Sequence, residues 1–143
     1  MGYIASIIAG AIMSIQGVVN TRLSEKTGLL LSNAYVQFTA FLFSLLALIF
    51  AEKIDFSSFG SVNKFYLTGG LLGLIITISV MMGVKRLSPT IAISTILISQ
   101  LLCASLIDAF GLMGSEKIAF LWNKYIGLLL MIGGVVLFKL DFS

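Results

Sequence analysis

Histidine is absent from this 143-residue chain, and cysteine and proline occur only once each. Because there are also only six acidic residues, we expect no cluster of metal-ligating side chains, no metal site and no cofactor. The single Cys103 cannot form an intrachain disulfide, and we interpret it as a small buried hydrophobic residue. We find no nucleophile–base pair and no phosphate-binding glycine loop, so we predict that the protein is not an enzyme.

Charge is scarce as well. Charged residues make up 10% of the chain and hydrophobic residues 59%, with a mean hydropathy of +1.11, whereas a soluble domain has about 25% charged residues. The net charge of +3 is small and divided among connections, which argues against a nucleic-acid partner. The composition predicts a chain whose solvent is the lipid bilayer.

Five apolar stretches are long enough to cross the roughly 30 Å of hydrocarbon in a bilayer. We predict spans at residues 2–22, 29–51, 65–84, 89–110 and 124–140. The first is not a cleavable signal, because it lacks a basic start and contains Gln16 and Asn20. The predicted fold class is an all-α membrane protein with five transmembrane helices and short loops, forming a single transmembrane domain over residues 1–143.

The nine basic residues are divided almost evenly between the two sides of the membrane. With five spans, the side of the N-terminus holds Lys53, Lys64, Lys117 and Lys124. The opposite side holds Arg22, Lys26, Lys85, Arg86 and Lys139. Orientation normally follows an excess of Lys and Arg in cytoplasmic loops, and an excess of one residue gives little preference.

Two interpretations follow from this balance. Arg22, Lys85 and Arg86 lie close to the membrane and could fix one orientation. Alternatively, the chain inserts both ways, which is dual topology, and pairs with an inverted copy. We favour dual topology, because an antiparallel dimer supplies ten helices in the inverted arrangement of many transporters. An oppositely oriented paralogue would do the same, and one chain does not separate a homodimer from a heterodimer.

Amide side chains occur inside the predicted spans, where polar groups are costly and usually face the protein interior. Gln16 and Asn20 are spaced i, i+4 and share a helix face, while Gln37 and Gln100 lie on other spans. Because an amide both donates and accepts hydrogen bonds, we predict that these four bind substrate. The alternative is hydrogen bonding between helices. We interpret Asn33, near a helix start, as a cap or headgroup contact.

Asp108 is the only acidic residue within a predicted span, and it stands just before Gly111, where we expect the helix to end. A carboxylate near a helix C-terminus is disfavoured by the helix dipole. We therefore expect a compensating cation such as Lys117 or Lys124. Asp108 is either a gate or part of an interfacial ion pair, and we favour the ion pair.

Small residues predict where helices pack and turn. Gly69 and Gly73 form a small-xxx-small pattern that lets two helix backbones approach closely. Gly28 is placed to end the first helix in a left-handed conformation. Ser88 and Pro89 have the order of an N-cap followed by a first helical residue.

Several motifs resemble the YdcZ-like family of bacterial membrane proteins, long labelled as a domain of unknown function. They are the run at residues 10–23 (GAIMSIQGVVNTRL), Val36-Gln37-Phe38, Ser99-Gln100-Leu101, and Asp108 with Phe110 and Gly111. The resemblance covers essentially the whole chain. It implies a place in the drug/metabolite transporter superfamily, in the bacterial inner membrane, with dual-topology homodimers, oppositely oriented heterodimers or fused ten-helix chains.

The resemblance extends to the small multidrug resistance proteins, with one departure. Those proteins carry a central glutamate in the first helix, whereas the comparable region here has Gln16, which cannot titrate. We therefore predict a multi-pass transporter that moves a small polar or amphipathic metabolite by alternating access in a dimer. The alternative is a non-transporting structural or regulatory subunit. A channel has less support, because no ring of charges or filter-like loop is present.

Overall fold

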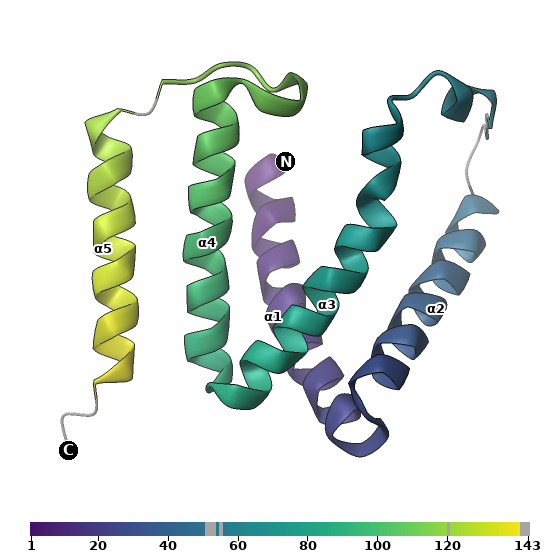
Figure 1. Ribbon diagram of the computed structural model, residues 1–143, viewed down its shortest axis with the longest axis horizontal. Coiled ribbons are helices and arrows are strands. Elements are labelled where there is room, and N and C mark those ends of the chain that lie inside the picture. Colours follow the sequence, from purple (N-terminus) through teal and green to yellow (C-terminus); the bar gives the residue numbers. More distant parts are fainter. Residues whose placement is uncertain (51–53, 55, 120, 141–143) are drawn as a thin grey trace. The chain divides into compact units, whose positions relative to one another are not determined.

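The computed structural model of the chain describes residues 1–50, 54, 56–119 and 121–140. Its long helices are α1 (Gly2–Thr27), α2 (Leu29–Leu48), α3 (Gly69–Arg86), α4 (Pro89–Phe110) and α5 (Trp122–Lys139), joined in this order (Figure 1). Short 3-10 helices precede α3 (Ser57–Gly60 and Lys64–Thr68) and follow α4 (Leu112–Gly114). All five long helices have the length and apolar composition of membrane spans, which confirms the predicted all-α class. Lys53 and the end of the predicted 29–51 span lie outside the described residues.

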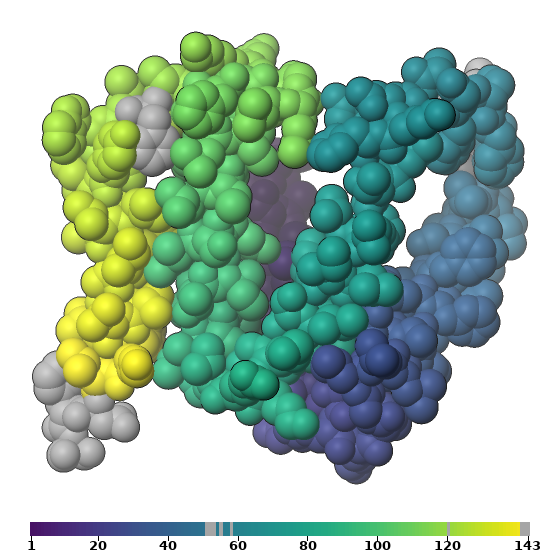
Figure 2. Space-filling model, viewed as in Figure 1, coloured from purple at the N-terminus to yellow at the C-terminus, as the bar shows by residue number. Residues whose placement is uncertain are grey.

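Contacts within the chain define two compact units, Met1–Lys85 and Arg86–Ser143. The first contains α1, α2 and α3, and the second contains α4 and α5. In the first unit α1 packs on α2, and in the second α4 packs on α5. The space-filling view shows α4 and α5 lying side by side (Figure 2).

The first helix continues beyond the predicted span and ends at Thr27 rather than near residue 22. The added residues are mostly polar, and Glu25 Oε2 among them lies 3.1 Å from Nη1 of Arg22, about one helical turn earlier. Because a helix bonds its own backbone, it can extend past the apolar stretch that the membrane requires. The length of the apolar stretch therefore underestimated the length of this helix.

Gly28 alone connects α1 to α2. Its N–H donates to the Ser24 carbonyl at 3.0 Å, and its carbonyl accepts from the Ser32 N–H at 3.1 Å. Its dihedral angles are φ 87° and ψ 155°, so the predicted left-handed helical conformation is wrong. The positive φ still requires glycine, because the chain has to reverse within a single residue.

The fourth helix begins and ends where the sequence predicts. Ser88 is its N-cap and accepts a hydrogen bond from the Ile91 N–H at 3.3 Å, and Pro89 is its first residue. Gly111 ends it in the left-handed conformation, with φ 63° and ψ 39°. Both ends are encoded locally, which is why sequence alone located them.

Few apolar side chains are buried within the described part of the chain. Met81, Val84 and Ala92 are buried hydrophobic residues, whereas Leu129 and Leu130 are about 70% exposed. Cys103 is also exposed, so our interpretation of it as buried is wrong. Apolar side chains need no protein interior when lipid is the solvent, and the helices accordingly present apolar surfaces to lipid or to a partner.

Candidate functional site

Five polar side chains are buried on either side of the Gly28 hairpin. Together they form the polar cluster: Asn20, Thr21 and Ser24 of α1, and Ser32 and Asn33 of α2. The cluster lies where the last turns of α1 pack on the first turns of α2. Because polar groups buried among apolar helices are costly unless they are bonded, their hydrogen bonds decide what the cluster can do.

The hydroxyl groups of the polar cluster are satisfied locally. Thr21 Oγ1 donates to the Gly17 carbonyl at 2.7 Å, and Ser24 Oγ donates to the Thr21 carbonyl at 2.8 Å. Ser32 Oγ and Thr27 Oγ1 lie 2.7 Å apart in a hydroxyl–hydroxyl hydrogen bond that joins the two helices. These hydroxyls therefore stabilise the hairpin and have limited capacity left for a ligand.

The amides of the polar cluster are different. Asn33 is only 4% exposed, and within the described part of the chain its Oδ1 accepts no hydrogen bond. A buried acceptor left unsatisfied costs about 1–3 kcal/mol. Asn20, on the facing helix, is 6% exposed. Our interpretation of Asn33 as a cap or headgroup contact is wrong, because the hairpin turn buries it; nearness to a helix start did not reveal this.

The remaining predicted amides lie in less buried places. Gln16 is exposed one turn before Asn20, and Gln37 is half-buried. Gln37 Nε2 lies 3.6 Å from the position of a Cβ built on Gly73, so α2 and α3 approach each other there. Gln100 is exposed on α4, in the second unit. The structure thus buries Asn20 and Asn33 on α1 and α2. Gln16 and Gln100 are instead exposed on their helices, where lipid or a partner chain would cover them.

The tightest glycine contact is at a residue that sequence analysis did not select. A Cβ built on Gly17 would lie 3.0 Å from Val80 Cγ1 of α3 and 4.0 Å from Val84 Cγ2. A Cβ built on Gly69 would have no atom within 4 Å. The spacing of Gly69 and Gly73 in the sequence shows that they share one face of α3, but it does not show which helix packs on that face. The packing role of Gly69 and Gly73 stays a prediction.

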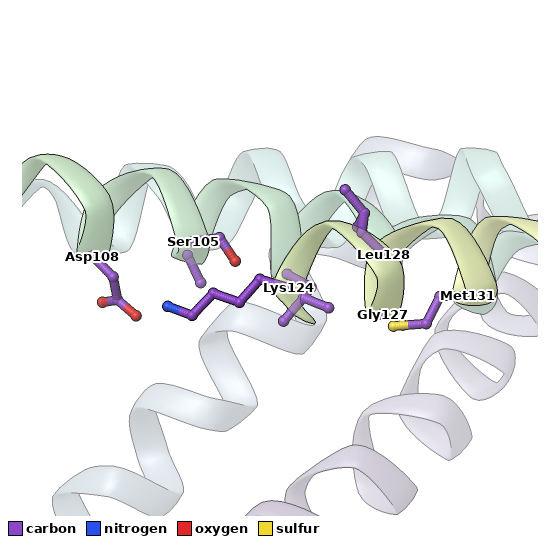
Figure 3. Close-up of a pocket in the computed structure, with 8 residues that line it drawn as sticks. Ser105, Asp108, Lys124, Gly127, Leu128 and Met131 are labelled. Atoms are coloured by element: carbon purple, nitrogen blue, oxygen red, sulfur yellow. The ribbon is translucent and has the colours of Figure 1, made fainter. Parts of the chain in front are cut away.

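A groove of about 470 Å³ lies between α4 and α5 in the second unit (Figure 3). Its charged residues are Asp108 and Lys124, its apolar walls include Leu101, Leu128 and Met131, and Ser105 lies between. The Lys124 side chain points toward the Asp108 carboxylate (Figure 3). We call this the α4–α5 groove.

The connection after α4 is hydrogen-bonded to the end of α4 that carries Asp108. The backbone carbonyl of Asp108 accepts hydrogen bonds from the Ile118 N–H at 2.9 Å and from the Gly111 N–H at 3.3 Å. The bond to Ile118 holds the chain beyond the 3-10 helix Leu112–Gly114 against the end of α4. Asp108 is thereby fixed at the C-terminal end of its helix, in the last turn.

A match to a protein-family model covers nearly the whole chain. The model, described as “Putative inner membrane exporter, YdcZ”, matches residues 1–137. The chain belongs to this family. It is therefore an inner membrane protein of an exporter family, and not an enzyme. No curated protein and no solved structure matches the chain.

The YdcZ match includes both compact units, so the polar cluster and the α4–α5 groove both belong to the family region. In the described part of the chain, no three His, Cys, Asp or Glu residues are grouped to hold a metal ion. The polar groups at the two places in this YdcZ-family chain are the amides and hydroxyls of the polar cluster and Ser105, Asp108 and Lys124 in the α4–α5 groove.

Proposed function

We propose that this chain moves a small polar or amphipathic metabolite by alternating access, as a dimer that is antiparallel. Gln16, Asn20, Gln37 and Gln100, with their counterparts in a second chain, line the substrate path. The observation that carries the proposal is the buried Oδ1 of Asn33 in the polar cluster, which accepts no hydrogen bond within the described part of the chain. A buried acceptor of this kind offers a hydrogen bond to a donor group of a solute.

The exposed amides support the dimer. Gln16 and Gln100 lie near the middle of α1 and α4 and are exposed on helices that also expose many large apolar side chains. An amide facing hydrocarbon loses its hydrogen bonds with water at a cost of several kcal/mol, on the order of 4 or more. A second chain, or a water-filled path that it completes, removes that cost. We propose an antiparallel partner because the basic residues are balanced.

Transport tests the assignment of the amides. Purified protein in liposomes loaded with a mixture of metabolites should release a subset of them, measured by mass spectrometry of the external solution. We expect Gln16→Ala and Gln37→Ala to slow that release at least tenfold. Thr39→Ala is the matched control on α2, because its hydroxyl bonds only its own helix backbone. Unchanged release in both glutamine variants would remove these residues from the substrate path.

An aqueous path is tested separately with thiol chemistry. In a Cys103→Ser background, Gln16→Cys should react with a membrane-impermeant thiol reagent, and Ile7→Cys, on the exposed apolar start of the same helix, should not. Reaction at neither position would mean that no water reaches Gln16, and the amides would then serve only to join helices.

A further inference from the structure

We infer that the α4–α5 groove binds a zwitterion: a molecule with an ammonium group and an acid group close together on an apolar body. The ammonium group pairs with Asp108 and the acid group with Lys124, and the apolar body lies along Leu101, Leu128 and Met131. This site lies within the second unit alone and does not depend on the amide-lined path proposed above.

The two charges lie at the helix ends that least favour them. Asp108 is in the last turn of α4, and Lys124 is in the first turn of α5. A helix dipole favours a cation at its C-terminus and an anion at its N-terminus, so each residue is opposed by its own helix. Each residue is therefore stabilised by an opposite charge in the groove, and a ligand carrying both charges offers one to each of them.

The shape of the groove fits a small amphipathic molecule. Its volume of about 470 Å³ falls within the roughly 300–1,000 Å³ of small-molecule sites. Leu101 precedes Asp108 by two helical turns, and Met131 follows Lys124 by two turns, so apolar walls extend about 10 Å from the charged end. The polar head and the apolar body therefore have separate places in one groove.

The sequence supplies a reporter and a way to block the groove. Trp122 is the only tryptophan and stands two residues before Lys124. Gly127 lines the groove, and a Cβ built on it would meet no atom within 4 Å. Gly127→Leu should therefore fill the groove while keeping both charges and the fold.

The direct test uses the full chain in phosphatidylglycerol nanodiscs, whose lipid has no ammonium group, with Trp122 fluorescence as the readout. The probes are 2-aminooctanoate, octylamine and octanoate, which share an apolar chain and differ in charge. We expect saturable binding of 2-aminooctanoate, at least tenfold tighter than either other probe, because two charge-assisted contacts form instead of one. Equal affinity for all three probes, or for the zwitterion and octylamine, would overturn the inference.

Variants separate binding from a purely structural ion pair. Asp108→Asn and Lys124→Gln should each weaken 2-aminooctanoate binding about tenfold, and Gly127→Leu should abolish it. Glu116→Gln and Lys139→Gln are the matched charge controls and should leave it unchanged. Circular dichroism checks that each variant keeps its helices. Normal binding by Gly127→Leu would show that the groove is not the site.

The zwitterion in the groove could be a soluble amino acid or a lipid headgroup, because both have an ammonium group near an acid group. Phosphatidylethanolamine has an ammonium group next to a phosphate, so nanodiscs containing it distinguish the two sources. If this lipid alters Trp122 fluorescence in the natural chain but not in Gly127→Leu, and prevents 2-aminooctanoate binding, the occupant is the lipid. If 2-aminooctanoate binds equally well with the lipid present, the occupant is a soluble zwitterion. No saturable response to either would refute the site.

Discussion

Gly17 illustrates what a single residue decides in this protein. Its missing side chain leaves room for Val80 of α3, with only 3.0 Å between Val80 Cγ1 and the place of a Cβ. Gly10, on the same helix, has no atom within 4 Å of that place. Two glycines that look alike in sequence therefore contribute differently to packing.

We expect Gly17→Val to destabilise the first unit by about 1–3 kcal/mol, because an added side chain overpacks a close contact. Gly10→Val makes the same change in helix propensity at an open position and is the control. Thermal unfolding in detergent, followed by circular dichroism, measures the difference. Equal midpoints for the two variants would mean that α1 and α3 do not pack at Gly17.

Asn33 and Ser32 are neighbours in the polar cluster, and replacing each by an apolar residue should change the free energy of unfolding in opposite directions. Asn33→Leu removes a buried acceptor that has no donor among the described residues, and we expect the free energy of unfolding to rise by about 1 kcal/mol. If the amide binds substrate, the same variant should lose transport.

Ser32→Ala is the contrasting change. It removes the 2.7 Å hydrogen bond to Thr27, and we expect the free energy of unfolding to fall by about 1 kcal/mol. Both variants can be measured in the same thermal unfolding assay. A fall in stability for Asn33→Leu would indicate that Asn33 already makes a stabilising hydrogen bond.

Among the elements, α4 is the one whose limits are most clearly written in the sequence. Ser88, Pro89 and Gly111 act through their own backbone conformation and local hydrogen bonds. The hairpin between α1 and α2 depends instead on Gly28, whose positive φ joins two helices without an intervening loop. The ends of α4 can be predicted from residue type alone. The hairpin at Gly28 becomes clear only when the directions of α1 and α2 are known.

Replacing the cap of α4 tests this local encoding. Ser88→Ala removes the acceptor of the Ile91 N–H, and we expect a loss of about 1 kcal/mol in stability. Ser88→Asp should retain most of the stability, because an aspartate also accepts at this position. Thermal unfolding of the three chains gives the comparison, and equal stability of Ser88→Ala and the natural chain would show that the cap contributes nothing.

At the scale of the whole molecule, the chain has a small interior and an apolar exterior. Few hydrophobic residues are buried among the described residues, and the basic residues are nearly balanced across the membrane. The exposed apolar side chains are therefore suited to contact lipid, and an orientation set by Lys and Arg would depend on a difference of one charge.

Single added charges should shift the orientation of the chain in opposite directions. Val62 and Leu87 are exposed and lie in connections on opposite sides of the membrane, because one span separates them. We expect Leu87→Arg to move the C-terminus toward the cytoplasm and Val62→Arg to move it outward. Reporters fused to the C-terminus, active on one side only, measure the populations. A natural chain found in a single orientation would exclude dual topology.

Most of the fold could be predicted from the sequence, because it depends on local properties. Apolar length and turn residues located five helices, and α4 begins and ends at the predicted residues. The predicted spans were less accurate for α1, because a helix can continue through polar residues. Asp108 was recognised as unusual from its place near a helix end.

The candidate sites needed the tertiary structure. Only the packing of α1 on α2 shows that Asn33 is buried while Gln16 is exposed. Only the contact of α4 with α5 places Lys124 in one groove with Asp108. Composition and helix caps act within a few residues of chain, so the sequence by itself determined a five-helix membrane protein. Burial and the grouping of side chains from different helices depend on which helix surfaces meet, so only the tertiary structure decided where the polar groups lie.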